Sequence, residues 1–387
     1  MILICLFVLN LAARWAAPTP RFEAQTIDDN IAIGYGLAIG DVDGDGKPDI
    51  LLADKKQFVW YRNGDWKRFV MIENLTPHDN VCLAARDLDG DGKVEVAVGA
   101  QWNPGETSDA TQSGSVHYLI RPQDPTQRWE ALPLPHEPTV HRMRWVRSAE
   151  GVPFLVVAPL HGRGNKGGAG AGVKLQAYRM PRDPREPWTL VTLDESMHLT
   201  HNLEVVETGK SPGRTHLYFA GKEGVRQVAG FSDKKTAGPA APVAGVELPT
   251  GEVRLGSLGG SQPFLATIEP MHGTAVAIYP LGNKARRQVL DEQLKEGHAL
   301  ATADLLGLGR DQVVAGWRLP NADNKVGIKL YVPADKTGTQ WQAHWIDENG
   351  MATEDLQVAD LNGDGKADII ASGRATKNLK IYWNKSS

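Results

Sequence analysis

A nine-residue acidic motif begins at Asp41, at Asp87 and again at Asp360. Carboxylate or amide oxygens stand at its positions 1, 3, 5 and 9, and glycines at positions 4 and 6 let the backbone curl so that position 7 can offer its carbonyl. Such oxygens suit Ca²⁺, although an EF-hand would need a glutamate at position 12 and flanking helices. A solvated turn is the alternative interpretation. The predicted calcium ligands are Asp41, Asp43, Asp45, Asp49, Asp87, Asp89, Asp91, Glu95, Asp360, Asn362, Asp364 and Asp368.

Apolar, β-rich runs follow each acidic loop, so the sites are expected in strand–loop–strand units. With the first loop residue as a phase mark, degenerate copies of the unit occur along the whole chain. The marks are Asp41, Asp87, Arg147, Glu207, Ser257, Asp304 and Asp360. Seven marks predict an all-β, seven-bladed β-propeller with four strands in each blade. The loop that begins at Asp304 has leucines where oxygens belong, so we expect no metal there.

The two ends of the chain are predicted to meet in one blade. The last unit stops at residue 387 before any fourth strand. Residues 21–28 precede the first strand and resemble the sequences of the predicted fourth strands. We therefore expect the N-terminal strand to complete the C-terminal blade, which closes the ring and leaves no open sheet edge.

Composition limits the class of protein and its partners. The 387 residues include 41 glycines and 24 prolines, which is typical of a turn-rich all-β protein. A formal net charge of −4 indicates neither a nucleic-acid partner nor binding to an anionic membrane surface. The two cysteines, Cys5 and Cys82, are not expected to pair, because Cys5 lies in an apolar leader.

That leader, residues 1–17, is too short to span a bilayer and ends in small residues, so we expect a signal peptide. A wrongly chosen start codon and a plain buried strand are the alternatives, because no basic residue precedes the apolar run. The predicted domains are a signal peptide over residues 1–17 and one propeller over residues 18–387, with no membrane span in the mature chain. The predicted location is secreted or periplasmic.

Histidines gather at one predicted ring. The residues six positions before the phase marks should surround the propeller axis, on the face opposite to the acidic loops. They are Tyr35, Val81, His141, His201, Gly251, His298 and Glu354. Imidazoles that face one another across a channel are natural ligands for Zn²⁺ or a similar ion, so His141, His201 and His298 are the predicted ligands, with Glu354 as a fourth ligand or a base. The alternative is a hydrogen-bonded channel lining.

A second ring is predicted on the same face, at the ends of the second strands and in the loops that follow. It comprises Gln101, Trp102, His161, Lys222, Glu223, Glu269, His272, Trp317, Arg318 and Arg374, with His78 and His198 nearby. Tryptophan rings and charged groups around a wet pocket suit a sugar, so Trp102, Lys222, Trp317, Arg318 and Arg374 are the predicted substrate-binding residues. For any one of these residues taken alone, a solvated rim residue is the preferred interpretation.

With these motifs, residues 21–387 resemble the FG-GAP or VCBS-type propellers, whose blades carry the same Asp-x-Asp-Gly-Asp-Gly loop. Residues 130–205 further resemble the propeller of fungal aldos-2-ulose dehydratase and its bacterial relatives, on the strings 135–145, 155–164 and 196–202. This resemblance implies a metal and the elimination of water from keto-sugars and anhydroketoses. The fungal enzyme also carries cupin domains, which this sequence lacks, so the resemblance does not extend to the isomerase half of its chemistry.

Two functions from different classes follow. The first is a metal-dependent carbohydrate lyase, a hydro-lyase, in which the ion polarises a ketone and His161, His78, His198 or Tyr35 moves protons. Glu354 is the further candidate base. The second is a secreted binding or interaction propeller in which calcium only stabilises the fold. The sequence indicates no oligomeric state.

Overall fold

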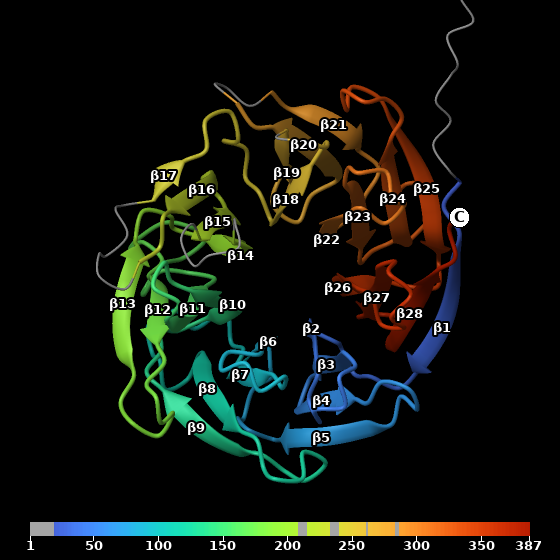
Figure 1. The fold of residues 1–387 in the computed structure, drawn as a ribbon. Helices are drawn as coiled ribbons and strands as arrows, with labels where there is room; N and C mark the ends of the chain where they lie inside the picture. The colour runs from blue at the N-terminus through green and yellow to red at the C-terminus, as the bar shows by residue number, and fades with distance from the viewer. Residues whose placement is uncertain (1–18, 208–214, 233–239, 261, 283–285) are drawn as a thin grey trace, which may run out of the picture.

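The computed structural model describes residues 19–207, 215–232, 240–260, 262–282 and 286–387. They form seven four-stranded antiparallel sheets arranged as a ring (Figure 1), which confirms the predicted seven-bladed propeller. The predicted signal peptide and Cys5 lie outside the described residues, and Cys82 is a buried free thiol. No helix among these residues is long and apolar enough to cross a membrane.

The innermost strand of each blade ends at or next to one of the seven phase marks. These inner strands are β2 (Gly36–Gly40), β6 (Cys82–Arg86), β10 (Val140–Arg147), β14 (Thr200–Glu207), β18 (Glu252–Ser257), β22 (Gly297–Ala303) and β26 (Thr353–Ala359). The second strands are β3 (Asp49–Ala53), β7 (Glu95–Ala100), β11 (Pro153–Pro159), β15 (Thr215–Gly221), β19 (Pro263–Glu269), β23 (Gln312–Trp317) and β27 (Asp368–Gly373).

The third and fourth strands lead from the middle of each blade to its outer edge. The third strands are β4 (Gln57–Tyr61), β8 (Ser115–Ile120), β12 (Leu175–Arg179), β16 (Gly224–Ala229), β20 (Ala275–Pro280), β24 (Gly327–Pro333) and β28 (Asn378–Asn384). The outer strands are β5 (Arg68–Glu73), β9 (Glu130–Leu134), β13 (Thr189–Asp194), β17 (Ala241–Pro242), β21 (Gln288–Asp291), β25 (Trp341–Glu348) and β1 (Phe22–Asp28).

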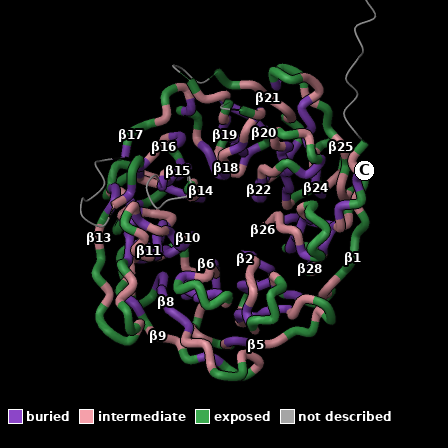
Figure 2. Tube along the Cα trace, viewed as in Figure 1, coloured by how far each residue is buried: buried purple, intermediate pink, exposed green. Residues whose placement is uncertain are grey.

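Burial follows the position of a strand within its blade. Every residue of β3 is buried, since neighbouring blades cover both of its faces, whereas the outer strand β25 alternates between exposed and partly buried residues. The cores lie between blades: Leu51 and Trp60 of the first blade pack with Val96 of the second. Figure 2 shows this gradient from the buried inner strands to the exposed rim. The ring is therefore held by apolar contacts between blades.

The ring closes as predicted, because β1 pairs antiparallel with β28 and completes the last blade. Asp28 at the end of β1 then accepts a hydrogen bond from Tyr61 of the first blade, with an O···O distance of 2.7 Å. Tyr382 and Asp347 make an equivalent contact between the last two blades, at 2.7 Å. An outer-strand aspartate thus links one blade to the third-strand tyrosine of the next.

Candidate metal centre in the axial cavity

Where the inner strands begin, the seven blades enclose a cavity of about 220 Å³. All seven blades contribute to its wall, so it lies on the propeller axis; we call it the axial cavity. Its lining residues are Tyr35, Val81, Trp102, His141, Arg142, Leu160, His201, His272, His298, Arg318, Glu354 and Arg374. Six of the seven predicted ring positions are among them, and the exception is Gly251, which has no side chain to reach inward.

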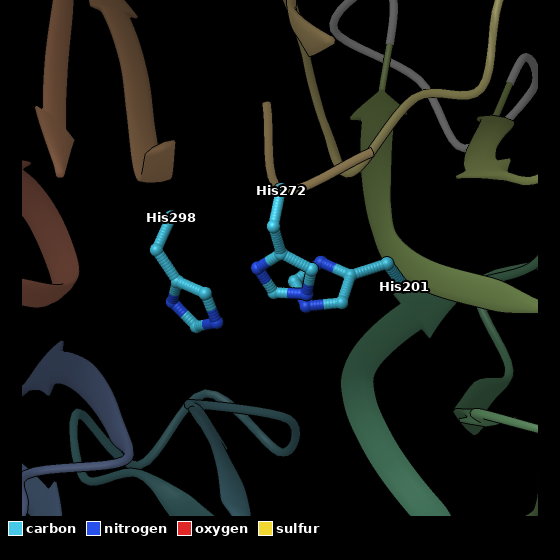
Figure 3. A group of neighbouring side chains, drawn as sticks. All are labelled: His201, His272 and His298. Atoms are coloured by element: carbon cyan, nitrogen blue, oxygen red, sulfur yellow. The ribbon is translucent and has the colours of Figure 1, made fainter. Parts of the chain in front are cut away.

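Three histidines form the tightest group in this cavity. One ring nitrogen from each of His201, His272 and His298 lies within 4.8 Å of the corresponding nitrogens of the other two. The ring centroids of His201 and His272 are 4.0 Å apart, and those of His272 and His298 are 4.7 Å apart. Figure 3 shows the three imidazoles gathered around a common space. We call this set the histidine group.

Backbone carbonyls orient two of these rings. His201 donates from Nδ1 to the carbonyl oxygen of Gly251 at 2.8 Å, and His298 donates from Nδ1 to that of Glu354 at 2.5 Å. A carbonyl can only accept, so Nδ1 carries the proton in both rings and the neutral form keeps its lone pair on Nε2. Within the described chain, Nε2 of His201 and Nδ1 of His272 are buried and have no hydrogen-bond partner. These nitrogens are free to bind a ligand.

The histidine group is uncharged in this environment. Burial lowers the pKa of His201 and His298 well below the ordinary histidine value, and the guanidiniums of Arg142 and Arg318 lower it further. Burial, with His201 beside it, lowers the pKa of His272 to about 2. Neutral imidazole is the form that binds a metal ion, so the group needs no deprotonation step at neutral pH.

A buried carboxylate lies beside the His201 ring of this group. Oε1 of Glu252 lies 3.2 Å from Nδ1 of His201, and both side chains are 1% exposed. The Nδ1 proton of His201 goes to the Gly251 carbonyl, so Oε1 of Glu252 lies beside the ring as a buried oxygen without a hydrogen-bond partner. Asn202 donates from Nδ2 to Oε2 of Glu252 at 2.5 Å and so fixes the carboxylate. A carboxylate behind a histidine is a common second layer around metal ligands.

His272 enters the cavity because the ring position in its own blade is a glycine. Met271 donates its backbone N–H to the carbonyl of Pro249 at 2.6 Å, which folds the loop after β19 over Gly251. A Cβ on Gly251 would lie 2.5 Å from the Met271 carbonyl oxygen, so a side chain there would push the loop away. The sequence analysis predicted His141, His201 and His298 as ligands. It did not predict that His272 would reach the cavity from the loop after β19.

His141 lies beside the histidine group and not within it. Its Nδ1 donates to the carbonyl of His201 at 2.9 Å, and its Nε2 lies 3.1 Å from Nη1 of Arg142. Both ring nitrogens are therefore engaged, unlike those of the three grouped histidines. Trp102 packs on this ring, with centroids 5.0 Å apart. In the structure His272 takes the place that the sequence analysis gives to His141.

The opposite wall carries two arginines held by one carboxylate. Glu354 accepts hydrogen bonds from Arg374 at 3.0 Å and from Arg318 at 3.3 Å, and burial raises the pKa of this carboxyl in spite of both guanidiniums. The Arg374 guanidinium lies 5.5 Å from the centroid of the Tyr35 ring. Tyr35 donates its hydroxyl to Asp79 at 3.2 Å, and burial raises its pKa to about 12. This wall combines two cations, one carboxylate and a phenol.

Several predicted site residues do not line the axial cavity. Trp317 as a sugar platform is wrong, because its side chain is 0% exposed and its indole donates to the Lys325 carbonyl. Lys222 instead donates to the Gly168 carbonyl at 3.1 Å. The three predicted proton-transfer histidines also lie outside the cavity wall: His78, His161 and His198. Tyr35, Glu354, Trp102, Arg318 and Arg374 remain at the site.

The acidic loops lie at the other ends of the inner strands. Asp41 accepts the backbone N–H groups of Gly44 and Gly46, both of which have φ near +83°, and Asp87 and Asp360 close their loops in the same way. Two sets of carboxylate oxygens lie within 4.8 Å of one another: Asp41, Asp43 and Asp45, and Asp87, Asp89 and Glu95. The ninth-position carboxylates Asp49 and Asp368 accept a backbone N–H on each oxygen, so they also hold the loop closed.

Comparison with known proteins agrees with the repeat pattern. The sequence model of an FG-GAP-like repeat matches residues 23–98, and that of the FG-GAP repeat matches residues 83–119. No curated protein matches the chain.

The similar solved structures match this chain over nearly the whole length of both chains. A chain from the crystal structure of the mitotic checkpoint complex has a TM-score of 0.59 at 12% identity, covering 99% of this chain and 97% of that one. A chain from BBS1N in complex with ARL6DN, soaked with mercury, has a TM-score of 0.57 at 12% identity, covering 95% and 97%. The WD40 β-propeller domain of Doa1 has a TM-score of 0.55 at 9% identity, covering 94% and 97%. At such identities only the fold is shared. Fold and repeats together identify the chain as a seven-bladed β-propeller of the FG-GAP type.

Proposed function

We propose that this propeller is a metal-dependent carbohydrate lyase that acts on a keto-sugar or anhydroketose by β-elimination. His201, His272 and His298 hold Zn²⁺ or a similar divalent ion. The observation that carries the proposal is the histidine group itself, in which neutral rings meet in a cavity and two buried ring nitrogens lack a partner. A buried polar atom without a partner costs on the order of 1–3 kcal/mol, which a bound ion would offset.

The donor set fits such an ion. Three histidines with one open position are a frequent catalytic arrangement for zinc, and the axial cavity supplies the space beside them. Glu252 lies 3.2 Å from Nδ1 of His201, where carboxylates commonly stand behind metal-bound histidines. When bound, the ion would act as a Lewis acid that polarises the substrate carbonyl.

The wall residues supply the proton transfers. β-Elimination breaks a C–H bond next to the carbonyl, forms a C=C bond and breaks the C–O bond at the next carbon. Glu354 accepts the C–H proton, which suits a carboxylate whose pKa burial has raised. Tyr35 donates its hydroxyl proton to the departing oxygen, which leaves as water. Trp102 offers a ring face for the sugar.

An elimination assay tests this function. Purified protein loaded with zinc and mixed with anhydrofructose should produce enone absorbance. Tyr35→Phe should lower the rate by about 10²- to 10⁴-fold while the metal content stays at the parent level. Metal-loaded parent protein that forms no enone from any keto-sugar tested would leave the binding propeller as the function.

We also propose that the acidic loops bind calcium as structural ions. Calcium about 100-fold above its dissociation constant should add about 2.7 kcal/mol of stability per site, seen as a rise in melting temperature that EGTA reverses. Asp43→Asn should reduce this rise. Asp304→Asn is the matched control, because Asp304 closes its loop with the same type of hydrogen bonds but has leucines beside it. An unchanged melting temperature of the parent on adding calcium would contradict the proposal.

We further propose a secreted or periplasmic location. Calcium loops in extracellular modules work at about 10⁻⁴ to 10⁻³ M calcium, which is far above cytosolic levels. The FG-GAP repeats over residues 23–119 support the same location.

A further inference from the structure

The wall of the axial cavity is rich in hydrogen-bond donors with positive charge. Arg142, Arg318 and Arg374 line it, and Glu354 is the one carboxylate among the lining residues. Glu296 at the rim accepts from Arg318 at 2.7 Å and compensates one further charge. Three guanidiniums therefore face two carboxylates at the mouth of the channel.

Deeper along the axis the balance reverses. Arg144 and Arg254 face the buried carboxylates Glu204 and Glu252 there, and the buried Asp355 lies near both Arg142 and Arg144; none of these carboxylates lines the cavity. The charges of the axial channel are thus separated along its length. The guanidiniums of Arg318 and Arg374 lie at the cavity itself, where a ligand would bind.

The guanidiniums of the wall also have unused donors. Nε of Arg318 is buried and lacks a hydrogen-bond partner. The Arg374 guanidinium makes one hydrogen bond in the described structure, from Nη1 to Glu354, and the side chain remains 42% exposed. The Arg142 guanidinium is already engaged, because its Nη1 contacts Nε2 and donates to the backbone carbonyl of His141, and Asp355 lies near it.

We infer that the natural ligand of the axial cavity is a sugar acid, whose carboxylate binds between Arg318 and Arg374. The inference rests on the proposed lyase function and names its substrate class. Guanidinium groups bind planar carboxylates through paired, charge-assisted hydrogen bonds, which are stronger than bonds between neutral groups. A carboxylate beside the ketone would place its negative charge on the arginine wall while the ketone faces the histidine group.

Two ketoses that differ at one carbon test the inference. 2-Keto-D-gluconate carries a carboxylate where D-fructose carries a hydroxymethyl group, and calorimetric titration gives a dissociation constant for each. Zinc-loaded parent protein should bind 2-keto-D-gluconate at least about tenfold more tightly than D-fructose, and the preference should shrink with added salt. Equal affinities would overturn the inference. Tighter binding of D-fructose 1-phosphate than of 2-keto-D-gluconate would overturn it in favour of a sugar phosphate.

Variants separate this inference from the lyase proposal. Arg374→Gln should reduce the preference for the acid to about twofold or less without changing the metal content. Arg185→Gln is the matched control, since Arg185 is also about half exposed and pairs with one glutamate, Glu130, on the outer wall. If the parent protein takes up no zinc but still prefers the acid, the lyase proposal is refuted and the sugar-acid site stands. A metal-loaded protein that eliminates water from neutral keto-sugars with no preference for the acid would do the reverse.

Discussion

Replacement of His201 by alanine is expected to lower the zinc affinity by more than about 100-fold and to abolish elimination with it. His201 belongs to the histidine group, with its ring centroid 4.0 Å from that of His272 and 5.1 Å from that of His298, and its Nε2 is one of the two buried nitrogens that lack a partner. Two histidines alone would not hold the ion in this cavity. Zinc content after dialysis and enone formation measure both losses.

Matched variants make this result specific. His344→Ala removes a histidine from the outer strand β25 and should change neither zinc content nor rate. Gly251→Ala acts on the group indirectly, because its Cβ would lie 2.5 Å from the Met271 carbonyl oxygen and displace the loop that carries His272. We expect it to weaken zinc binding about 10- to 100-fold with the fold intact. Full zinc occupancy in His201→Ala would show that the ion binds elsewhere.

Deletion of residues 21–28 is expected to destabilise the whole ring, by on the order of 5 kcal/mol, and to cause aggregation. The deletion removes β1, whose pairing with β28 spans Phe22 to Asp28, and exposes the edge of the last blade. It also removes the Asp28 carboxylate that Tyr61 and Arg68 contact in the first blade. Thermal melting and light scattering follow the two effects.

A peptide in trans provides the control for this deletion. A synthetic peptide of residues 19–30 should pair with the exposed edge of β28 and restore solubility, whereas a scrambled peptide should not. Asp28→Ala should give a smaller loss than the deletion, because it keeps the strand and removes only the contact with the first blade. A deleted protein that stays soluble and melts at the parent temperature would contradict the closure described here.

The fold could be predicted from the sequence because every blade repeats the same pattern of strands and loops in the same order. Each phase mark lies at or directly after the end of an inner strand, so a count of marks gives the number of blades, and the missing fourth strand of the last unit requires the N-terminal strand. The same phase brought His201, His298 and Glu354 to one cavity. These predictions depend on backbone period alone.

The remaining site residues depend on side-chain space between blades, which no period encodes. His272 comes from a loop, and it reaches the axis only because Gly251 leaves its place empty. A glycine at a ring position followed by a histidine in the next loop is the signal that could have indicated it. Glu252 and Arg142 follow ring positions directly, and only the packing shows that one lies beside His201 and the other engages His141.

Anomalous X-ray diffraction at the zinc edge from crystals of the zinc-loaded protein tests the central claim most directly. We predict one strong peak in the axial cavity, about 2.0–2.1 Å from a ring nitrogen of each of His201, His272 and His298. The peak should be absent from crystals of His201→Ala grown in the same way. A cavity without anomalous signal, or zinc found only at the acidic loops, would contradict the metal centre and the lyase function built on it.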